Sequence, residues 1–128
     1  MNNLIRILII TLSVVMFSSK SFSKWTETFM IGKGEAIHYI DFDRVRKKNG
    51  YVYWWSLIDL SKPNKGILSI MGYAQGDCKM YRRKVLSIVT YKKNMGRGTS
   101  KTYDGDDKWI YPRPKTAHED ALKRLCNE

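Results

Sequence analysis

Two histidines, His38 and His118, are the side chains best suited to acid–base chemistry in this sequence, and they stand in a chain rich in lysine and arginine. A pair of histidines placed across one phosphate can act as the general acid and general base of a small ribonuclease. The sequence does not show whether the two converge. We interpret His38 as a strand residue and His118 as part of the first turn of a helix, and a small secreted hydrolase using this pair stays an alternative.

The other motifs give no support to catalysis. An acidic tetrapeptide, Asp104-Gly105-Asp106-Asp107, misses the D-x-D-x-D-G spacing of a calcium loop and has no closing glutamate. No Cys–His or Ser–His–Asp spacing matches a catalytic signature, and no glycine run joins a strand to a helix as a phosphate loop does. We interpret the tetrapeptide as a turn, and we expect no enzymatic activity, no metal and no cofactor.

The two cysteines, Cys78 and Cys126, predict a structural disulfide. An even number of cysteines in an exported chain favours pairing, whereas a redox-active pair needs close spacing such as C-x-x-C. On the chain-entropy model, closing a loop of roughly 50 residues stabilises a fold by about 4 kcal/mol. For a domain of this size, that bond supplies much of the stability.

The amino terminus predicts export. A positive charge at Arg6 precedes an apolar run over residues 7–17, and Ser21 and Ser23 fit the small-residue positions of a cleavage site. We therefore expect a signal peptide over residues 1–23 that is removed after Ser23. The protein is then periplasmic or secreted.

The expected mature protein is one small domain, residues 24–128. The apolar run before it is shorter than the ~20 residues that a membrane-spanning helix needs, and no cysteine stands at the cleavage point to receive a lipid. We expect no stable membrane anchor after cleavage. An uncleaved amino-terminal anchor is the alternative, because Lys20 and Lys24 crowd the cleavage site.

The chain is strongly basic, with a formal net charge of +11 at pH 7. Such a charge attracts polyanions of every kind, including glycans, lipopolysaccharide and nucleic acid. Exposed aromatic rings among the cations would add stacking platforms, and Tyr81 and Tyr91 are interleaved with them. The simpler interpretation is a row of basic side chains on the wet side of a strand. The candidate polyanion-binding residues are Lys79, Arg82, Arg83, Lys84, Lys92, Lys93, Arg97 and Lys101.

The elements that position these residues are mostly strands, because short runs of β-branched and aromatic residues alternate with turn residues. Asn49-Gly50 is a strong hairpin signal, and residues 61–66 have the composition of a loop. The run 51–60 is almost wholly apolar or aromatic, which predicts a central strand covered on both faces. The other expected strands are 25–31, 36–42, 67–73, 78–92, 99–103 and 109–111.

A helical pattern appears only at the end of the chain. Thr116 and Glu119 match a capping box and predict a helix from Ala117, with an inward stripe of Ala121, Leu122, Leu125 and Cys126. A bridge from Cys126 to Cys78 would hold this helix on the sheet. The predicted fold is α+β: a single curved antiparallel sheet of about six strands with a C-terminal helix packed on one face, disulfide-linked.

Trp54 and Trp55 are adjacent on the expected central strand and must point to opposite faces. One of them enters the core beneath the helix. The other lies on the far face, where small monomers rarely leave a large apolar patch uncovered. Either loops or a partner cover that face, and we favour a partner, such as a second copy of this chain.

Several short motifs in this order resemble the surface-adhesin protein E-like domain family of Gram-negative bacteria. The resemblance implies a sheet-plus-helix fold in a small secreted or lipid-anchored domain. It also implies adhesin-like binding: one dimeric member binds host matrix proteins and haem, but no binding residue is carried over. The motifs are Trp25, Tyr39-Ile40-Asp41, Val52-Tyr53-Trp54, Asp77-Cys78-Lys79 with Arg82 and Leu86, Tyr91, Trp109-Ile110-Tyr111-Pro112, and Glu119 to Cys126.

We therefore predict an exported, non-catalytic binding module of the bacterial envelope. Its partner is an envelope or extracellular ligand of unknown identity, for which the basic charge favours an anionic one. A periplasmic polyanion-binding protein is the alternative function.

Overall fold

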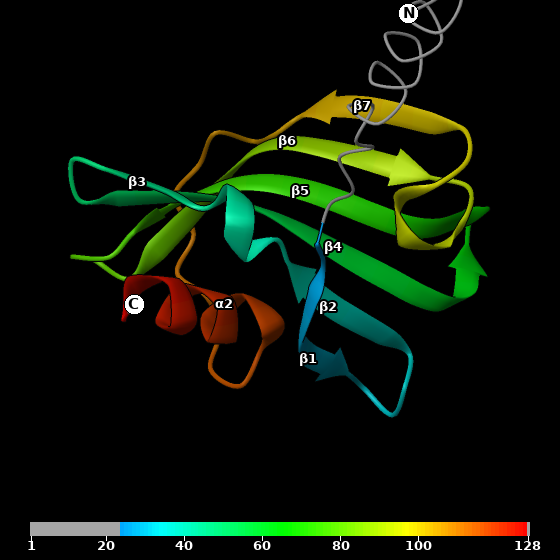
Figure 1. The fold of residues 1–128 in the computed structure, drawn as a ribbon, viewed down its shortest axis with the longest axis horizontal. Helices are drawn as coiled ribbons and strands as arrows, with labels where there is room; N and C mark the ends of the chain where they lie inside the picture. Colours follow the sequence, from blue (N-terminus) through cyan, green and yellow to red (C-terminus); the bar gives the residue numbers. More distant parts are fainter. Residues whose placement is uncertain (1–23, 128) are drawn as a thin grey trace, which may run out of the picture.

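Seven strands form one antiparallel sheet, and α2, an α-helix near the carboxyl end, lies on one face of it (Figure 1). This computed structural model describes residues 24–127, so the expected signal peptide, 1–23, and the last residue of the expected domain lie outside the described part. The strand order is β1-β2-β4-β5-β6-β7, and the short β3 also pairs with β4. The predicted α+β class is confirmed, with seven strands where about six were expected.

The three longest strands, β4, β5 and β6, form the middle of the sheet. Two short 3-10 turns, η1 and η2, interrupt the succession of strands. The elements are β1 (Thr26–Ile31), β2 (Ala36–Ile40), η1 (Phe42–Arg44), β3 (Arg46–Lys48), β4 (Tyr51–Asn64), β5 (Ile67–Asp77), β6 (Arg82–Tyr91), η2 (Asn94–Gly96), β7 (Ser100–Asp104) and α2 (Ala117–Cys126).

One edge of β4 carries two strands in succession: β2 pairs with residues 56–60 and β3 with residues 51–53. Between them, the carboxylate of Asp41 accepts a hydrogen bond of 3.2 Å from the amide of Asp43 and caps η1. This cap ends β2 at Ile40, two residues before the end of the predicted strand. The Asn49-Gly50 turn into β4 is confirmed, and both of its residues have a positive φ.

The predicted loop over residues 61–66 is wrong in its first four residues, which extend β4. The chain reverses only at Lys65-Gly66, where both residues have a positive φ. Pro63 is tolerated in the strand because the pairing of β4 with β5 is irregular between Asp59 and Asn64, so no regular ladder bond is lost there.

The predicted strand 78–92 begins only at Arg82, because the residues before it form a tight turn. The carboxylate of Asp77 accepts hydrogen bonds from the backbone amides of Lys79 and Met80, at 3.1 and 3.2 Å. It also accepts one of 3.0 Å from Nε of Arg82. Burial alone would raise the pKa of Asp77, but these bonds together lower it.

The predicted start of the C-terminal helix is confirmed. Thr116 is the N-cap of α2, and its hydroxyl accepts a hydrogen bond from the amide of Glu119. The reciprocal bond differs from the expected capping box: the carboxylate of Glu119 accepts from the amide of Lys115, at 3.1 Å, one residue before the cap. The predicted inward residues Ala121, Leu122 and Leu125 are buried.

The core lies between α2 and one face of the sheet, where Leu122 and Leu125 pack with side chains of β2, β4 and β5. Gly76 permits this close approach, since a Cβ there would lie 2.8 Å from Leu122. The predicted disulfide is confirmed: Cys78 and Cys126 are bonded, with their Cα atoms 5.4 Å apart. The bond joins the β5–β6 turn to the end of α2.

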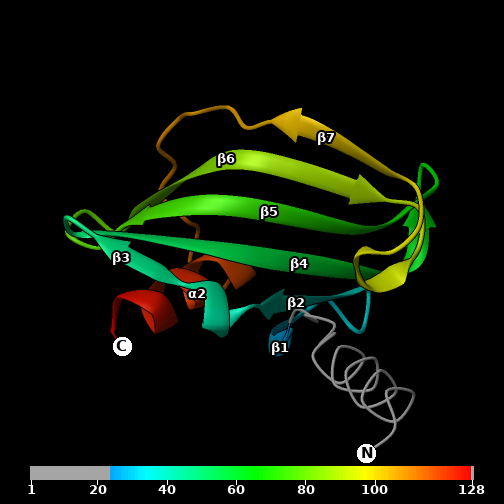
Figure 2. The same cartoon turned by 45° about the horizontal axis from the view of Figure 1, so that its top comes forward.

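The helix covers only part of its face of the sheet. It lies across the end that carries the β3–β4 hairpin, and no helix of residues 24–127 lies over the end that carries the β4–β5 turn (Figures 1 and 2). Among residues 24–127, no helix is long and apolar enough to cross a membrane.

Candidate binding surfaces

The face of the sheet opposite α2 carries a row of aromatic side chains. Trp55 and Tyr73 are cross-strand partners with ring centroids 4.9 Å apart, and Tyr53 stacks on Tyr73 at 6.4 Å. Tyr51 stacks on Trp109 at 6.0 Å. Strand alternation places Tyr51, Tyr53, Trp55 and Tyr73 on the face away from Val52 and Trp54, and Trp109 lies there through its stacking on Tyr51. We call this set, Tyr51, Tyr53, Trp55, Tyr73 and Trp109, the aromatic face.

Two cations lie over the Trp109 ring at one end of this face. The Arg82 guanidinium and the Lys84 ammonium are each 4.5 Å from the ring centroid, close enough for cation–π attraction. Asp107, from the acidic tetrapeptide, also lies 3.3 Å from the Lys84 ammonium. We call Tyr51, Arg82, Lys84 and Trp109 the Trp109 cluster.

The chain after β7 returns to the sheet to bring Trp109 there. Residues 109–111, expected as a strand, make instead a single bridge in which Ile110 exchanges two backbone hydrogen bonds with Arg83, of 2.9 and 2.7 Å. This bridge pairs the first half of β6, beyond the reach of β7. The sequence shows no signal for the meeting of Trp109 with β6, because η2, β7 and residues 105–108 lie between them in the chain.

The eight candidate polyanion-binding residues do not share one face in the described structure. Arg82 and Lys84 belong to the aromatic face, but Arg83 between them points to the face that carries α2. Lys79 lies in the β5–β6 turn. The remaining four are exposed at the other end of β6 and around η2: Lys92, Lys93, Arg97 and Lys101.

The two tyrosines expected among these cations have different surroundings. Tyr81 is exposed, and its hydroxyl lies 3.3 Å from the Asn127 side-chain oxygen. Tyr91 is half-buried, and its hydroxyl lies 3.4 Å from Sδ of Met71. Only Tyr81 is therefore open to a stacking partner.

The loop after β6 covers the far end of the aromatic face. The Ser69 hydroxyl accepts a hydrogen bond of 2.9 Å from the amide of Gly96 and donates one of 2.6 Å to the carbonyl of Lys93. The Asp59 carboxylate accepts one of 2.7 Å from the amide of Met95. These bonds hold η2 against β4 and β5, so the protein's own loop covers this part of the sheet.

Trp54 and Trp55 occupy the two environments that alternation requires. Trp54 is 2 % exposed and packs in the core under α2. Trp55 is half-buried and borders an open cavity of about 500 Å³ between the aromatic face and the η1–β3 segment. The two arginines of that segment, Arg44 in η1 and Arg46 in β3, belong to no sequence motif that would have predicted them as site residues. The lining is Asp43, Arg44, Val45, Arg46, Trp55 and Tyr73.

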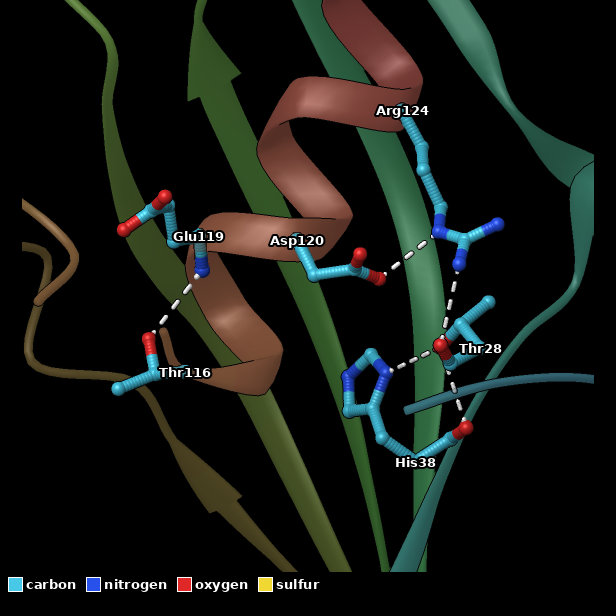
Figure 3. A network of polar contacts seen from close by, with 6 residues as sticks. All are labelled: Thr28, His38, Thr116, Glu119, Asp120 and Arg124. Atoms are coloured by element: carbon cyan, nitrogen blue, oxygen red, sulfur yellow. Dashed lines mark hydrogen bonds and ion pairs between the residues drawn. The ribbon is translucent and has the colours of Figure 1, made fainter. Parts of the chain in front are cut away.

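The two histidines converge under the first turn of α2. Their ring centroids are 6.0 Å apart, and the rings are perpendicular. Nδ1 of His38 lies 2.9 Å from the Thr28 hydroxyl (Figure 3). Burial lowers the pKa of both to about 4; nearby Asp120 opposes the shift at His38, and Arg83 adds to it at both. Both rings are therefore neutral at pH 7.

An ion pair on α2 ties this histidine pair to the edge of the sheet. Nε of Arg124 lies 2.8 Å from the Asp120 carboxylate, and its Nη2 donates to the carbonyl of Thr28 at 3.2 Å (Figure 3). Among residues 24–127, no group of three or more His, Cys, Asp or Glu side chains is placed to hold a metal ion. The histidine pair is thus a buried polar contact between β2 and α2.

This fold and these surfaces define a small disulfide-linked α+β domain that displays an aromatic sheet face. The chain belongs to the surface-adhesin protein E family, whose model matches residues 25–127. Among curated proteins, no sequence match is found. Membership indicates an adhesin-like binding role and a location in the envelope or outside the cell.

Solved structures of protein E from Haemophilus influenzae share this fold. Its crystal form II has a TM-score of 0.64 and 16 % sequence identity, with 84 % of this chain and 91 % of that chain covered. Protein E from a non-typeable Haemophilus influenzae gives 0.57 and 15 %, with 84 % and 86 % covered. At such low identity the likeness extends to the fold alone.

Proposed function

We propose that this protein is an exported, non-catalytic binding module of the bacterial envelope that contacts extracellular ligands through its aromatic face. Family membership supports adhesin-like binding. The observation that carries the proposal is the Trp109 cluster, where Arg82 and Lys84 lie 4.5 Å from one aromatic ring on a face that α2 does not cover.

The chemistry of the cluster favours a ligand that carries anionic groups. Arg82 and Lys84 supply cationic groups, which are paired with Asp77 at 3.0 Å and with the exposed Asp107 at 3.3 Å, so an anionic ligand competes with these carboxylates. Tyr51 and Trp109 supply flat apolar surface beside them. Sulfated or carboxylated glycans and acidic protein segments combine anionic groups with apolar patches, so they fit such a surface. The ligand class is thus anionic, and the polyanion-binding alternative concerns the same cluster.

Binding of heparin, a sulfated glycan, to the purified protein tests this assignment. Lys84→Gln removes one cation from the Trp109 cluster, whereas Lys62→Gln removes the same charge from an exposed position at the opposite end of β4. We expect Lys84→Gln to weaken heparin binding about fivefold and to lower the slope of log affinity against log salt concentration by about one. Lys62→Gln should bind heparin about as tightly as the wild type. Isothermal titration calorimetry at two salt concentrations measures both quantities.

An equal loss in both variants would contradict a defined site, because it would mean that the net charge alone attracts heparin. No heparin binding by the wild-type protein at low salt would contradict the anionic ligand class. A pull-down from envelope or host extract, repeated at high salt, then separates shape-specific partners from electrostatic ones.

The histidine pair supports a non-catalytic protein. A general acid must be protonated at the working pH, and the pKa of both rings lies near 4. His38 is 1 % exposed, so a substrate does not reach it. The ribonuclease alternative predicts RNA hydrolysis that a combined His38→Ala and His118→Ala change abolishes; we expect no such activity in either protein.

Export follows from the expected signal peptide, residues 1–23. We expect the protein in the periplasmic or culture fraction to begin at Lys24. Amino-terminal sequencing of that fraction measures the cleavage site, and a chain that keeps residues 1–23 in the membrane fraction would show the uncleaved anchor instead.

A further inference from the structure

The part of the α2-bearing face that the helix leaves uncovered contains a cavity of about 210 Å³. Its walls are apolar side chains of the three central strands, and His118 in the first turn of α2 stands at one end with Arg83. The cavity is therefore an apolar groove that ends in polar groups. The apolar walls are Ile58, Ile70, Val85 and Ile88.

Two glycines of β5 show that the groove is open space. Gly76 lies under α2, and a Cβ there would meet Leu122 and Trp54 at 2.8 and 2.9 Å. Gly72 lies in the groove, and a Cβ there would meet only the Ser56 hydroxyl, at 3.5 Å. Neither packing nor a positive φ requires a glycine at position 72. Its missing side chain leaves the floor of the groove empty.

Arg83 brings an uncompensated positive charge to the end of this groove. Its Nε is buried without a hydrogen-bond partner, and no acidic side chain among residues 24–127 forms an ion pair with it. The neighbouring Arg82, in contrast, is paired with Asp77 at 3.0 Å. A half-buried guanidinium without a counter-charge is costly, and such costs are retained where a charged ligand supplies the partner.

His118 adds a hydrogen-bonding ring at the same place, and the buried His38 lies next to it, with ring centroids 6.0 Å apart. Nε2 of His38 is buried without a partner, while Nδ1 on the opposite side of the ring faces Thr28 (Figure 3). His118 borders both this groove and a second cavity of about 220 Å³ on the other side of Arg83. This end of the groove is therefore polar and carries the positive charge of Arg83. The carboxylate nearby, that of Asp120, is paired with Nε of Arg124 at 2.8 Å.

We propose that the groove binds a small monocarboxylic acid with an apolar body. The carboxylate pairs with the Arg83 guanidinium and accepts a hydrogen bond from His118, and the apolar body lies over Gly72. A cavity of about 150 Å³ holds a benzene ring, so a groove of about 210 Å³ accepts one ring or a short alkyl chain. The site lies on the face opposite the aromatic face and does not depend on the function proposed above.

Three probes with matched parts test the ligand class on the purified protein. Octanoate has both the chain and the charge, octanol has the chain alone, and acetate has the charge alone. We expect octanoate to bind at least tenfold more tightly than either of the others, because each lacks one of the two halves of the site. Isothermal titration calorimetry or NMR shifts of the groove residues measure the affinities.

Two variants test the charged half and the apolar half of the site separately. Arg83→Met removes the charge and keeps an apolar side chain of similar length, and Gly72→Val places a branched side chain on the floor of the groove without a clash at Cβ. Each should weaken octanoate binding at least tenfold. Lys62→Met, which removes an exposed positive charge at the far end of β4, should leave it unchanged. Melting curves of all four proteins show that the variants are folded.

Several outcomes would overturn the proposal. One is octanol that binds as tightly as octanoate. Another is an equal affinity of the Gly72→Val and Lys62→Met variants for octanoate. This comparison is decisive even if Arg83→Met does not fold. A third is wild-type protein that binds no octanoate up to its solubility limit.

Discussion

At the scale of single residues, His38 and His118 meet although they lie 80 positions apart in the chain. Strand alternation already places His38 on the same face as Ile40, the face that α2 covers. The capping residues already place His118 in the first turn of a helix. The sequence could not show the contact itself, because neither the strand alternation nor the helical pattern determines where along the sheet the helix packs.

The buried histidine pair predicts a loss of stability in mild acid. An unfolded histidine has a pKa of about 6.5, whereas His38 and His118 are held near 4 in the folded protein. The unfolded chain therefore binds more protons between these values, so stability is full above pH 6.5 and falls as the pH drops toward 4. For His38 the full effect is about 3 kcal/mol, and His118 adds a contribution of the same sign.

Urea denaturation at pH 7 and pH 5 measures this effect. The window above pH 5 lies above the usual pKa of carboxylates, so histidines dominate it. We expect a protein with His38→Gln and His118→Gln to lose most of the pH dependence between these two values. If the double variant loses as much stability between pH 7 and pH 5 as the wild type does, groups other than these histidines titrate in this pH range.

At the scale of elements, most of the sheet and the helix could be predicted from periodicity, the Asn49-Gly50 turn and the Thr116 cap. The errors fall where one side chain or one turn decides a boundary. Asp41 and Asp77 bind backbone amides at the ends of their strands, and the chain reverses only at Lys65-Gly66, four residues after the start of the predicted loop. Such local side-chain hydrogen bonds compete with strand pairing, and residue types alone predict them poorly.

The candidate site was less predictable than the fold. Alternation on β6 requires Arg82 and Lys84 to point away from Arg83, so a run of basic residues is already divided between two faces. The ring that gathers Arg82 and Lys84, Trp109, comes from a segment whose return to β6 depends on the bridge at Ile110. That return is a tertiary contact, which residue types and spacing do not encode locally.

Because the disulfide joins the β5–β6 turn to the end of α2, we expect the stability of the fold to depend on the oxidation of Cys78 and Cys126. Cys78→Ser should lower the melting temperature by about 15 °C or more, since a bond of this loop length is worth about 4 kcal/mol in a domain of this size. Calorimetry measures the change. Cys126→Ser should give the same value, as should reduction of the wild-type protein.

Free thiols in the denatured, unreduced protein from the periplasmic fraction would contradict this expectation. So would a melting temperature of the Cys78→Ser protein equal to that of the oxidised wild type. Either result would mean that α2 holds to the sheet through the packing of Leu122 and Leu125 alone.

At the scale of the whole molecule, η2 covers one end of the aromatic face, and the area around Trp55 and Tyr73 stays half-exposed. We expect a second copy of the chain to cover this area, so the protein is a dimer in solution. Trp55→Glu places a charge in that interface and should give a monomer with the fold intact. Light scattering of both proteins measures their mass.

A wild-type monomer whose tryptophans are all protected from a soluble quencher would contradict the dimer, because the protein's own loops would then cover the face. Lys62→Glu, with the same change toward negative charge far from Trp55, serves as the control and should not alter the mass.

The position of Cys126 has a consequence for the timing of folding. It follows the seven strands of residues 24–127 and lies 48 positions beyond its partner, so the covalent bond cannot close until the whole sheet has been synthesised. The strand pairing of the sheet is non-local, which makes it intrinsically slow. Until α2 docks, the apolar face beneath the helix is uncovered, and at that stage the chain is most exposed to proteases and to aggregation. The disulfide then fixes the end of α2 to the sheet.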